Sequence, residues 1–390
     1  MIEPYRTIAH VALKCVHYGV NLLFPKDSKK ILFQSGPEDY VDNSRALSDY
    51  ILSKQEYADY KVYWAMKSDS VPFTDSRIYC FNRTGKYGVI KYFYHTVTAK
   101  YMFSTHGAFG WFCHYRQKYL CLWHGSMLKK IGFLQDPVAN KYYQRHCKMI
   151  STSSEYYRDI YARNFGKNKN EIYATGYPRT DLLFKDTDCL SKLGVDVCQY
   201  CKIIFYMPTF RHTEDSTTNV FEKGYIRFTD DNNLDTWNEY LKGKKMLLIV
   251  KPHPSDKNTP SHINLSNIKV ITNNDLFKVN IQLYELIHYA DALLTDFSGV
   301  YTDYMILDRP IGFLLDDFEE YGKGRGFVFD NPIDYMPGAI ITDSNQFETF
   351  LSEIALNIDS TAEKRKKLKH VYNDFFDGKS CERCLKAVGL

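Results

Sequence analysis

The feature of this sequence that most constrains its fold is a repeated alternation of short apolar runs with longer amphipathic stretches. A buried strand is expected at residues 30–35, ending in a polar loop with Gly36, and a helix follows at 45–52. Strand, helix and strand in this rhythm predict a parallel sheet with helices on both faces. Further strand-like runs in this half of the chain lie at 60–65, 101–104, 119–123, 149–151 and 171–174, with a helix expected at 154–164.

A second series of the same kind begins after a polar stretch between residues 185 and 200. Its strand-like runs lie at 202–206, 246–250, 268–271, 292–296 and 311–315, and the region from 343 to 390 is largely helical in pattern. Two successive sheets joined near residue 190 predict an α/β fold with two doubly wound domains that face each other across a cleft. We therefore expect an N-terminal segment at 1–25, a first domain at 26–190, a second domain at 191–345 and C-terminal helices at 346–390 that pack back across both domains.

Composition narrows the classes of protein that this chain can be. Hydrophobic residues make up 44% of the chain, which is enough for more than one core and excludes intrinsic disorder as the main state. The 50 basic and 46 acidic residues leave a net charge of +4, which is too small to favour a dedicated nucleic-acid binder. The basic run at 364–367 is typical of a solvated helix face.

The cysteines and the first residues of the chain predict where the protein works. The N-terminus lacks the pattern of a signal peptide, and no apolar run is long enough to span a membrane. We therefore expect a cytoplasmic protein whose ten cysteines are mostly small buried hydrophobes. The pairs Cys198/Cys201 and Cys381/Cys384 have the spacing of zinc ligands, but they lie about 180 residues apart and lack the flanking sequence of a zinc knuckle.

The N-terminal segment has a helical pattern of its own. The apolar run from Tyr5 to Phe24 is interrupted by basic residues, and its apolar positions fall near one face of a helix. We expect this helix either to lie in the interface of a membrane or to pack on its own domain, and periodicity does not separate the two.

Five motifs fall beyond the carboxyl ends of predicted strands, where ligands bind in doubly wound sheets, and a sixth lies near the C-terminus. The first is Trp123-His124-Gly125, followed by Lys129. Histidine transfers protons near neutral pH, and glycine lets the backbone approach a substrate closely. Lys129 is expected at a helix start, where free N–H groups add to the attraction for an anion. Taken alone, a His-Gly pair is better explained as a structural turn.

Two further motifs present arginines at strand ends. One is the turn that carries Arg179 and Asp181, and the other is the strand end that carries Thr209 and Arg211. An arginine can hold a phosphate through two parallel hydrogen bonds. A turn-capping Arg–Asp pair explains the first motif nearly as well.

The fourth motif is a Pro-His-Pro turn in the second half of the chain. Lys251 precedes it, and its prolines fix the backbone around His253, whose alternative role is that of a buried histidine satisfied by the backbone. The sixth motif, near the C-terminus, contains Glu382 and Arg383.

The fifth motif is the longest and runs from Thr295 to Asp303. Ser298 and Gly299 lie where a strand is expected to turn into a helix, so their N–H groups can cradle phosphate oxygens. Asp296 is alternatively a simple helix cap.

In this order and spacing, the six motifs resemble those of the CDP-glycerol glycerophosphotransferase family, the teichoic-acid primases and polymerases of bacterial cell walls and capsules. The resemblance covers nearly the whole chain from Lys30 onward and includes the Asp-Asn-Ser-Arg stretch at 42–45. It implies a glycosyltransferase-B-like architecture of two Rossmann-type domains, the first binding the acceptor and the second the donor, with the active site in the cleft between them. It also implies transfer of glycerol phosphate or ribitol phosphate from CDP-glycerol or CDP-ribitol to a hydroxyl of the acceptor, with release of CMP. The implied acceptor is a saccharide linked to undecaprenyl diphosphate, or the growing polymer.

The resemblance also implies roles for individual residues. His124 resembles the general base for the acceptor hydroxyl, and His253 resembles the residue that stabilises the donor phosphates. The other matched residues are expected to contact substrate: Gly125, Lys129, Arg179, Asp181, Thr209, Arg211, Lys251, Thr295, Asp296, Ser298, Gly299, Asp303, Glu382 and Arg383. No metal ligand is assigned, no cofactor is firmly implied, and a requirement for Mg²⁺ is left open.

The chain departs from the family pattern in two places. Cys381 and Cys384 replace residues that are commonly small or apolar, which weakens the zinc hypothesis further. Many relatives have two serines where this chain has Ser298-Gly299, so one hydroxyl is absent while the backbone donors remain. Because the implied acceptor is a lipid, we expect peripheral attachment to the inner face of the cell membrane. Two alternatives stay open: a glycosyltransferase of the same architecture that uses a nucleotide sugar, and a non-catalytic scaffold that docks at the membrane through its N-terminal helix.

Overall fold

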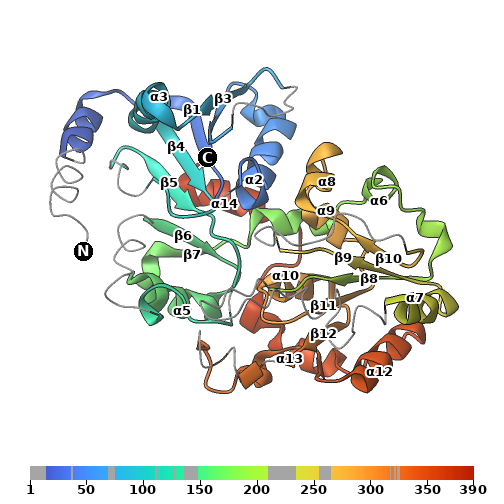
Figure 1. Cartoon of the computed structure of the whole chain (residues 1–390). Helices are drawn as coiled ribbons and strands as arrows, with labels where there is room; N and C mark the ends of the chain where they lie inside the picture. The colour runs from blue at the N-terminus through green and yellow to red at the C-terminus, as the bar shows by residue number, and fades with distance from the viewer. Residues whose placement is uncertain are drawn as a thin grey trace. The chain divides into compact units, whose positions relative to one another are not determined.

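The structure is a computed structural model of the 390-residue chain (Figure 1). It describes residues 15–36, 38–68, 75–109, 113, 115–126, 128–135, 148–209, 234–253, 265–316, 318–319, 322 and 326–390. The chain divides into two compact units, each built on one parallel sheet. The first unit contains residues 1–124, 131–181 and 377–390, and the second contains residues 125–130 and 182–376.

The first unit has a seven-stranded sheet in the order β3-β2-β1-β4-β5-β6-β7. Its strands are β1 (Asp27–Gln34), β2 (Lys61–Met66), β3 (Ile78–Asn82), β4 (Ala99–Ser104), β5 (Lys118–Cys121), β6 (Met149–Thr152) and β7 (Ile172–Ala174). The chain runs outward from β1 to β3, then returns and builds the other half of the sheet from β4 to β7. The strand order therefore reverses between β1 and β4. A reversal of this kind is the expected place for a ligand site in a doubly wound sheet.

Alternate residues of these strands face opposite sides of the sheet. On one side, buried strand residues such as Phe33 and Trp64 form a core with α2 (Asp42–Ser53) and α14 (Ser380–Val388). The other side carries α3 (Gly85–Thr98), whose His95 ring stacks on Phe81 of β3. Figure 1 shows α14, the last helix of the chain, lying against the strands of this first sheet.

One more helix of the first unit shows how local sequence sets an element. In α5 (Glu155–Phe165), the hydroxyl of Ser154 accepts a hydrogen bond from the N–H of Tyr157, and Gly166 ends the helix with a φ of 59°. Serine is a favoured N-cap, and glycine is favoured where a helix ends in left-handed backbone. The predicted helix at 154–164 is therefore confirmed, with its start moved by one residue.

The second unit repeats the topology in a six-stranded sheet with the order β10-β9-β8-β11-β12-β13. Its strands are β8 (Lys202–Tyr206), β9 (Met246–Val250), β10 (Ile268–Val270), β11 (Ala292–Thr295), β12 (Ile311–Leu314) and β13 (Ala339–Ile341). Here the strand order reverses between β8 and β11. Each unit thus has one reversal point, and each reversal point is the expected place for a ligand site.

Helices cover both sides of the second sheet. On one side, α7 (Leu234–Gly243) and α12 (Ser344–Ala355) bury Leu241 and Phe350 in a core with the strands. Elsewhere α10 (Val300–Tyr304) packs on β11, and its Tyr301 hydroxyl donates to Tyr372 of α13 (Ala362–Tyr372) at 2.9 Å. The remaining short helices are α6 (Cys189–Lys192), α8 (Asn273–Lys278), α9 (Leu283–Ile287) and the 3₁₀ turns η1 (Gln55–Tyr57), η2 (Gly132–Leu134), η3 (Lys169–Glu171), η4 (Pro178–Phe184), η5 (Val197–Gln199), η7 (Met305–Leu307) and η8 (Pro332–Tyr335).

Every strand predicted from the sequence is present, and no strand end differs by more than three residues. The prediction missed β3 and β13, which are edge strands of the two sheets. Both segments are largely apolar in sequence, and several residues of each are only partly buried.

The division into units differs from the predicted domain boundaries at 190 and 345. The second unit begins at residue 182 and includes α12 and α13, and only the segment from 377 onward returns to the first unit. It returns because Leu385 and Val388 of α14 are buried in the core of the first sheet. The predicted cleft between the domains stays a prediction, and each unit is described by itself below.

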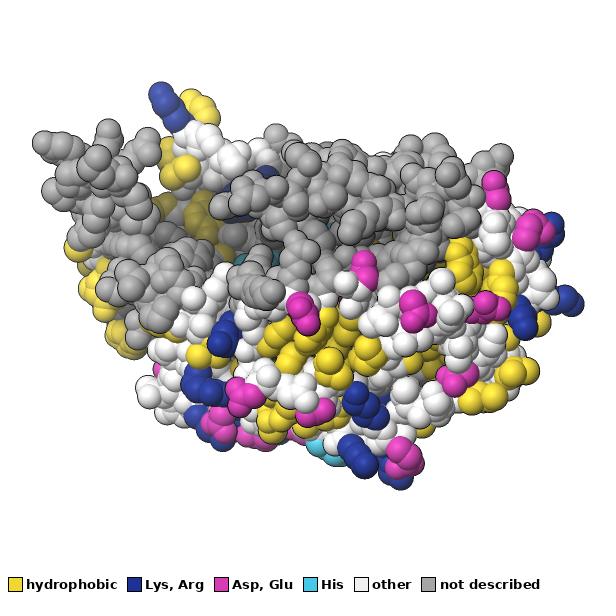
Figure 2. Space-filling view, turned by 60° about the horizontal axis from the view of Figure 1, so that its bottom comes forward, with side chains coloured by type: hydrophobic (Ala, Val, Ile, Leu, Met, Phe, Trp, Pro, Cys, Tyr) yellow, Lys and Arg dark blue, Asp and Glu magenta, His cyan; other side chains and the backbone are white. Residues whose placement is uncertain are grey.

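The surface charge is mixed on the face seen in Figure 2. Basic and acidic side chains of the described residues are interspersed there among hydrophobic ones. A nucleic-acid binder needs a continuous basic surface that neutralises several phosphates. The described residues on this face provide no such surface.

Within the first unit, Asp181 binds the start of the C-terminal helix α14. One carboxylate oxygen accepts a hydrogen bond from the N–H of Ser380, and the other accepts one from the N–H of Cys381, both at 2.8 Å. Burial raises the pKa of Asp181, and the two N–H donors oppose this effect. The structure therefore gives Asp181 the role of a cap for α14, whereas its predicted substrate contact stays a prediction.

Replacing Asp181 by alanine is expected to lower the free energy of unfolding by about 1–3 kcal/mol, because buried N–H groups of α14 lose their acceptor. Urea-induced unfolding followed by circular dichroism measures the effect. Lys386→Ala, an exposed change in the same helix, is the control and is expected to stay within about 0.5 kcal/mol of the parent. Equal effects from the two substitutions would show that Asp181 does not hold α14.

Candidate active site

His124 lies in the first unit, shortly after the end of β5. Trp123 before it is fully buried and has left-handed backbone with a φ of 55°, which is uncommon for a bulky residue. The rings of Trp123 and His124 stack with centroids 4.1 Å apart, and Trp123 packs in turn on Phe165 of α5. The ring of the candidate base therefore packs on a buried aromatic side chain.

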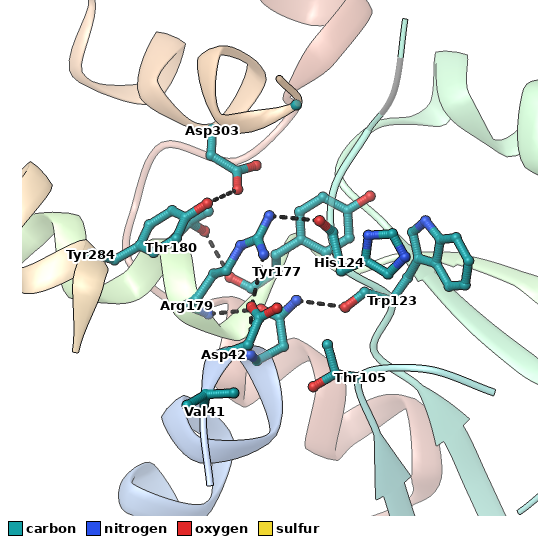
Figure 3. A network of polar contacts seen from close by, with 12 residues as sticks. Val41, Asp42, Thr105, Trp123, His124, Tyr177, Arg179, Thr180, Tyr284 and Asp303 are labelled. Atoms are coloured by element: carbon teal, nitrogen blue, oxygen red, sulfur yellow. Dashed lines mark hydrogen bonds and ion pairs between the residues drawn. The ribbon is translucent and has the colours of Figure 1, made fainter. Parts of the chain in front are cut away.

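Arg179, at the start of η4, holds the backbone of His124 (Figure 3). Its guanidinium donates one hydrogen bond to Asp42 at 2.7 Å and another to the carbonyl oxygen of His124 at 2.9 Å. Charge-assisted bonds from the planar guanidinium fix both distance and direction. In this structure Arg179 therefore positions protein groups, and its predicted contact with substrate phosphate stays a prediction.

The start of α2 completes this arrangement with two residues that the sequence analysis did not assign to the site. The fully buried Asn43 donates to the carbonyl oxygen of Trp123 at 2.8 Å and accepts from the N–H of Arg179 at 3.0 Å. Its neighbour Asp42 has left-handed backbone with a φ of 62°. Both residues lie in the Asp-Asn-Ser-Arg stretch of the family resemblance, so the signal for their role was present in the sequence.

A second histidine, His106, was missed entirely. It follows β4 and stacks on His124 with ring centroids 4.4 Å apart and an angle of 23° between the ring planes. The strand predicted at 101–104 ends just before it, so a search of every strand end would have found it.

In the second unit, Asp296 is the centre of a buried hydrogen-bond cluster. Its carboxylate accepts from the Thr209 hydroxyl at 2.6 Å, from the Thr209 N–H at 2.9 Å and from the Ser298 N–H at 3.2 Å. Thr295 donates from its hydroxyl to the carbonyl oxygen of Met207 at 2.7 Å. These bonds tie together the loops after β8 and β11, at the reversal point of the second sheet. The structure thus brings together four of the predicted residues.

Positive charge gathers beside this cluster. The ring of His253 is exposed, but partial burial and then the charges of Lys129 and Lys251 lower its pKa, while the Asp296 carboxylate opposes them. Lys251 itself is buried, and its ammonium donates to the carbonyl oxygen of Pro252 at 3.1 Å. The lowered pKa favours an uncharged imidazole at neutral pH, which can donate one hydrogen bond and accept another.

Lys129 lies in a β-bridge, so the expectation of a helix start at Lys129 is wrong. Lys129 forms an antiparallel bridge with Phe327, and the N–H of Val328 donates to the carbonyl oxygen of Leu128 at 2.8 Å. This pairing occupies the backbone groups that a helix would need. The charge of Lys129 acts on His253, and the substrate contact predicted for this lysine stays a prediction.

Gly299 packs tightly against the same segment. A Cβ at this position would lie 2.9 Å from the carbonyl oxygen of Ser126, which is closer than side chains and backbone normally approach. This contact is a physical reason for glycine at this position.

Asp303 lies deeper in the second unit than the prediction implied. It is fully buried in α10 and accepts a hydrogen bond from the Tyr284 hydroxyl at 2.5 Å (Figure 3). This contact gives Asp303 a role in packing α10 against α9. Its substrate contact stays a prediction.

The two C-terminal candidates belong to the first unit. Arg383 pairs with Asp377 at 2.9 Å and donates to the carbonyl oxygen of Thr175, while Glu382 is exposed. Arg211, the remaining candidate, lies outside the described residues.

Among the residues that the structure describes, no group of three or more His, Cys, Asp or Glu side chains is placed to hold a metal ion. Cys381 and Cys384 are buried, and burial raises the pKa of the Cys384 thiol to about 12. Cys384 donates to the hydroxyl of Thr175 at 3.4 Å. A zinc ligand is a thiolate, so this environment disfavours the zinc hypothesis for this pair.

Comparison with known proteins decides the family. A family profile described as CDP-glycerol:poly(glycerophosphate) glycerophosphotransferase matches residues 16–390. The chain belongs to this family. Relatives include a teichoic acid poly(glycerol phosphate) polymerase of Bacillus subtilis, 28% identical over 78% of this chain and 41% of its own length. A teichoic acid glycerol-phosphate transferase of Staphylococcus aureus is 25% identical over 90% of both chains. A teichoic acid poly(ribitol-phosphate) polymerase of Bacillus spizizenii is 26% identical over 95% of this chain and 58% of its own length.

Solved structures show the same fold. A structure of the wall teichoic acid polymerase TagF aligns with a TM-score of 0.76 at 22% identity, covering 98% of this chain and 95% of that chain. A structure of Staphylococcus aureus MnaA with UDP aligns with a TM-score of 0.52 at 12% identity, covering 92% of this chain and 95% of that chain. The two parallel sheets and this likeness confirm the glycosyltransferase-B-like fold class.

Replacing Gly299 by alanine is expected to lower the free energy of unfolding by about 1–3 kcal/mol, because the added methyl group overpacks the contact with Ser126. The midpoint and slope of urea unfolding measure this effect. Gly243→Ala is the control, since no atom lies within 4 Å of the added Cβ at the end of α7. We expect the control to be neutral or slightly stabilising, and a neutral Gly299→Ala would contradict the tight packing.

Proposed function

We propose that this protein transfers a polyol phosphate from a CDP-linked donor to a hydroxyl of a growing or lipid-linked acceptor and releases CMP. The observation that carries the proposal is the fixed position of His124 at a strand end, in a chain that belongs to the glycerophosphotransferase family. In this reaction the acceptor oxygen attacks the phosphorus that bears the polyol. The bond from that phosphorus to the oxygen of CMP breaks, and the proton of the acceptor hydroxyl passes to a base.

We assign the base to His124. Phosphoryl transfer depends on positioning and on charge stabilisation more than on covalent chemistry, so the base must be held in place before the substrate arrives. Arg179 fixes the backbone of His124, and the stack on Trp123 limits movement of the ring. Neither contact uses a ring nitrogen of His124, the atom that would accept the proton.

We assign the donor phosphates to the charged cluster of the second unit. Lys129 and Lys251 supply positive charge, and the uncharged His253 supplies a hydrogen bond beside them. Preorganised charges of this kind stabilise the negative charge that spreads over the transferring phosphate. One structure of TagF was obtained after a soak with CDPG, which supports a CDP-linked donor for this family.

The identity of the polyol is a separate question. The relatives include polymerases of both glycerol phosphate and ribitol phosphate, at 24–28% identity. Both donors are therefore part of the test.

Purified protein is expected to release CMP when CDP-glycerol or CDP-ribitol is supplied with a synthetic lipid-linked disaccharide. His124→Ala should lower this rate by about 10²–10⁴-fold, because a general base contributes that much. His370→Ala, which removes an exposed histidine of α13, is the control and should keep the full rate. CMP release that survives His124→Ala would refute the assigned base, and release from neither donor would refute the proposed donors.

We further propose that the first unit attaches to the anionic inner face of the cell membrane, where a lipid-linked acceptor is found. Within the described residues, no helix has both the length and the apolar character to cross a bilayer. Residues 15–23 form a helix whose polar side faces the protein: His17 and Asn21 are buried, and Asn21 donates to Gln117 at 3.0 Å. Its apolar side chains are exposed, with Leu23 84% exposed.

The adjacent helix α3 extends this apolar surface. His17 bonds to Thr96 of α3 at 3.1 Å, so the two helices pack together. On α3, Tyr87 is 83% and Ile90 is 65% exposed. Neither helix contains an acidic residue, and α3 carries Lys86 and Lys91. Apolar side chains among basic ones bind the interface of an anionic bilayer.

The protein is expected to bind vesicles that contain phosphatidylglycerol, and binding should weaken as salt is added. The double variant Leu23→Asp, Ile90→Asp should lose most of this binding, because two carboxylates would face the anionic surface. The control is Leu356→Asp, a residue 67% exposed after α12, which should bind like the parent. Co-sedimentation with vesicles measures the effect, and equal loss in the control would contradict this docking surface.

A further inference from the structure

His106 occupies the reversal point of the first sheet without an assigned role. His106 follows β4, and Gly36 follows β1. These two strands pair with each other at the reversal point. A Cβ built on Gly36 would overlap the Nδ1 and Cε1 atoms of His106. The imidazole of His106 therefore lies directly against the backbone at Gly36, and only glycine leaves it room.

The same imidazole contacts the ring of His124. The two rings are nearly parallel, with centroids 4.4 Å apart and an interplanar angle of 23°. His124 is thus stacked on Trp123 at 4.1 Å and on His106 at 4.4 Å. Movement of the His106 ring would remove an aromatic contact of the candidate base.

Hydrogen bonds hold the backbone of the loop that carries His106. The Ser104 hydroxyl bonds to the carbonyl oxygen of His106 and lies 2.7 Å from the Tyr119 hydroxyl. Next to it, the Thr105 hydroxyl lies 2.9 Å from that of Ser44 in α2. These bonds fix the loop after β4 on β5 and α2.

The chemical state of His106 differs from that of a proton-transfer group. Its Nδ1 atom is buried and has no hydrogen-bond partner among the described residues. Burial lowers the pKa of His106, while Asp42 opposes this effect and Arg179 adds to it. The His106 ring is therefore uncharged at neutral pH. When His124 takes a proton, the face of an uncharged aromatic ring attracts the positive charge.

We propose that His106 is a positioning residue, held in place by Gly36, whose ring keeps the imidazole of His124 oriented for proton transfer. This inference rests on the proposed function, because it assumes that His124 is the base. It predicts that the flat ring of His106 matters and that its nitrogen atoms do not.

Two substitutions disturb the stack from opposite sides. His106→Ala removes the ring, and Gly36→Ala leaves the ring but displaces it. Each should lower kcat for CMP release by about 10–100-fold, because small errors in the position of a reacting group cost that much, whereas KM for the donor should stay unchanged. In the double variant the losses should not multiply, since an alanine at 106 leaves space for the methyl group on residue 36.

His106→Phe tests whether the ring alone is sufficient. Phenylalanine keeps a flat aromatic face and lacks the nitrogens, so this variant should recover most of the kcat lost in His106→Ala. The control is His95→Ala, which removes a histidine stacked on Phe81 at 4.4 Å, also with a buried Nδ1 that lacks a partner among the described residues. It should change stability but not kcat.

A readout without substrate completes the test. With histidines labelled at the Cε1 carbon, the signal of His124 should move and broaden in His106→Ala and in Gly36→Ala, but not in His95→Ala. An unchanged His124 signal, or an unchanged kcat in His106→Ala, would overturn the proposal. A His106→Phe variant as inactive as His124→Ala would also overturn it, since a nitrogen of His106 would then take part. Turnover that survives His124→Ala would instead refute the proposed base. The histidine signals of the His106 and Gly36 variants would then still show whether His106 orients the ring of His124.

Discussion

Parallel strand pairing with one reversal of strand order is the constraint on which this structure depends. The reversal lies between β1 and β4 in the first unit and between β8 and β11 in the second. Ligand sites of doubly wound sheets are expected at such points, and residues of the candidate site lie at both of them. In the first unit His106 lies there against the backbone of Gly36, and in the second Asp296 bonds to Thr209. The chemistry of the protein is thus placed by the way its sheets are built.

The polar residues around each reversal point mainly hold other protein groups. Arg179 and Asn43 bond the backbone of His124 and Trp123, and Asp296 bonds the backbone of Thr209. Several residues that resemble substrate ligands in sequence are therefore supports in the structure. This distribution suits phosphoryl transfer, in which most of the catalytic effect comes from groups that are positioned before the substrate binds.

The sequence was a good guide where local pattern and burial agree. All of the central strands were predicted, whereas the edge strands β3 and β13 were missed although both segments are largely apolar. The helix start expected at Lys129 was wrong, because that segment pairs with residue Phe327, about 200 positions further along the chain. A pairing over such a distance leaves no signal in the residues next to Lys129.

By itself, the sequence determined the fold class, the family and the strand ends that carry His124 and His253, because each depends on short-range pattern or on ordered motifs. Only the tertiary structure decided which side chains meet. The stack of His106 on His124 joins the ends of two strands, and the cap of α14 by Asp181 joins residues 199 positions apart. The physical reason is that these contacts depend on distances between chain segments that strand order and register bring together. No local propensity encodes those distances.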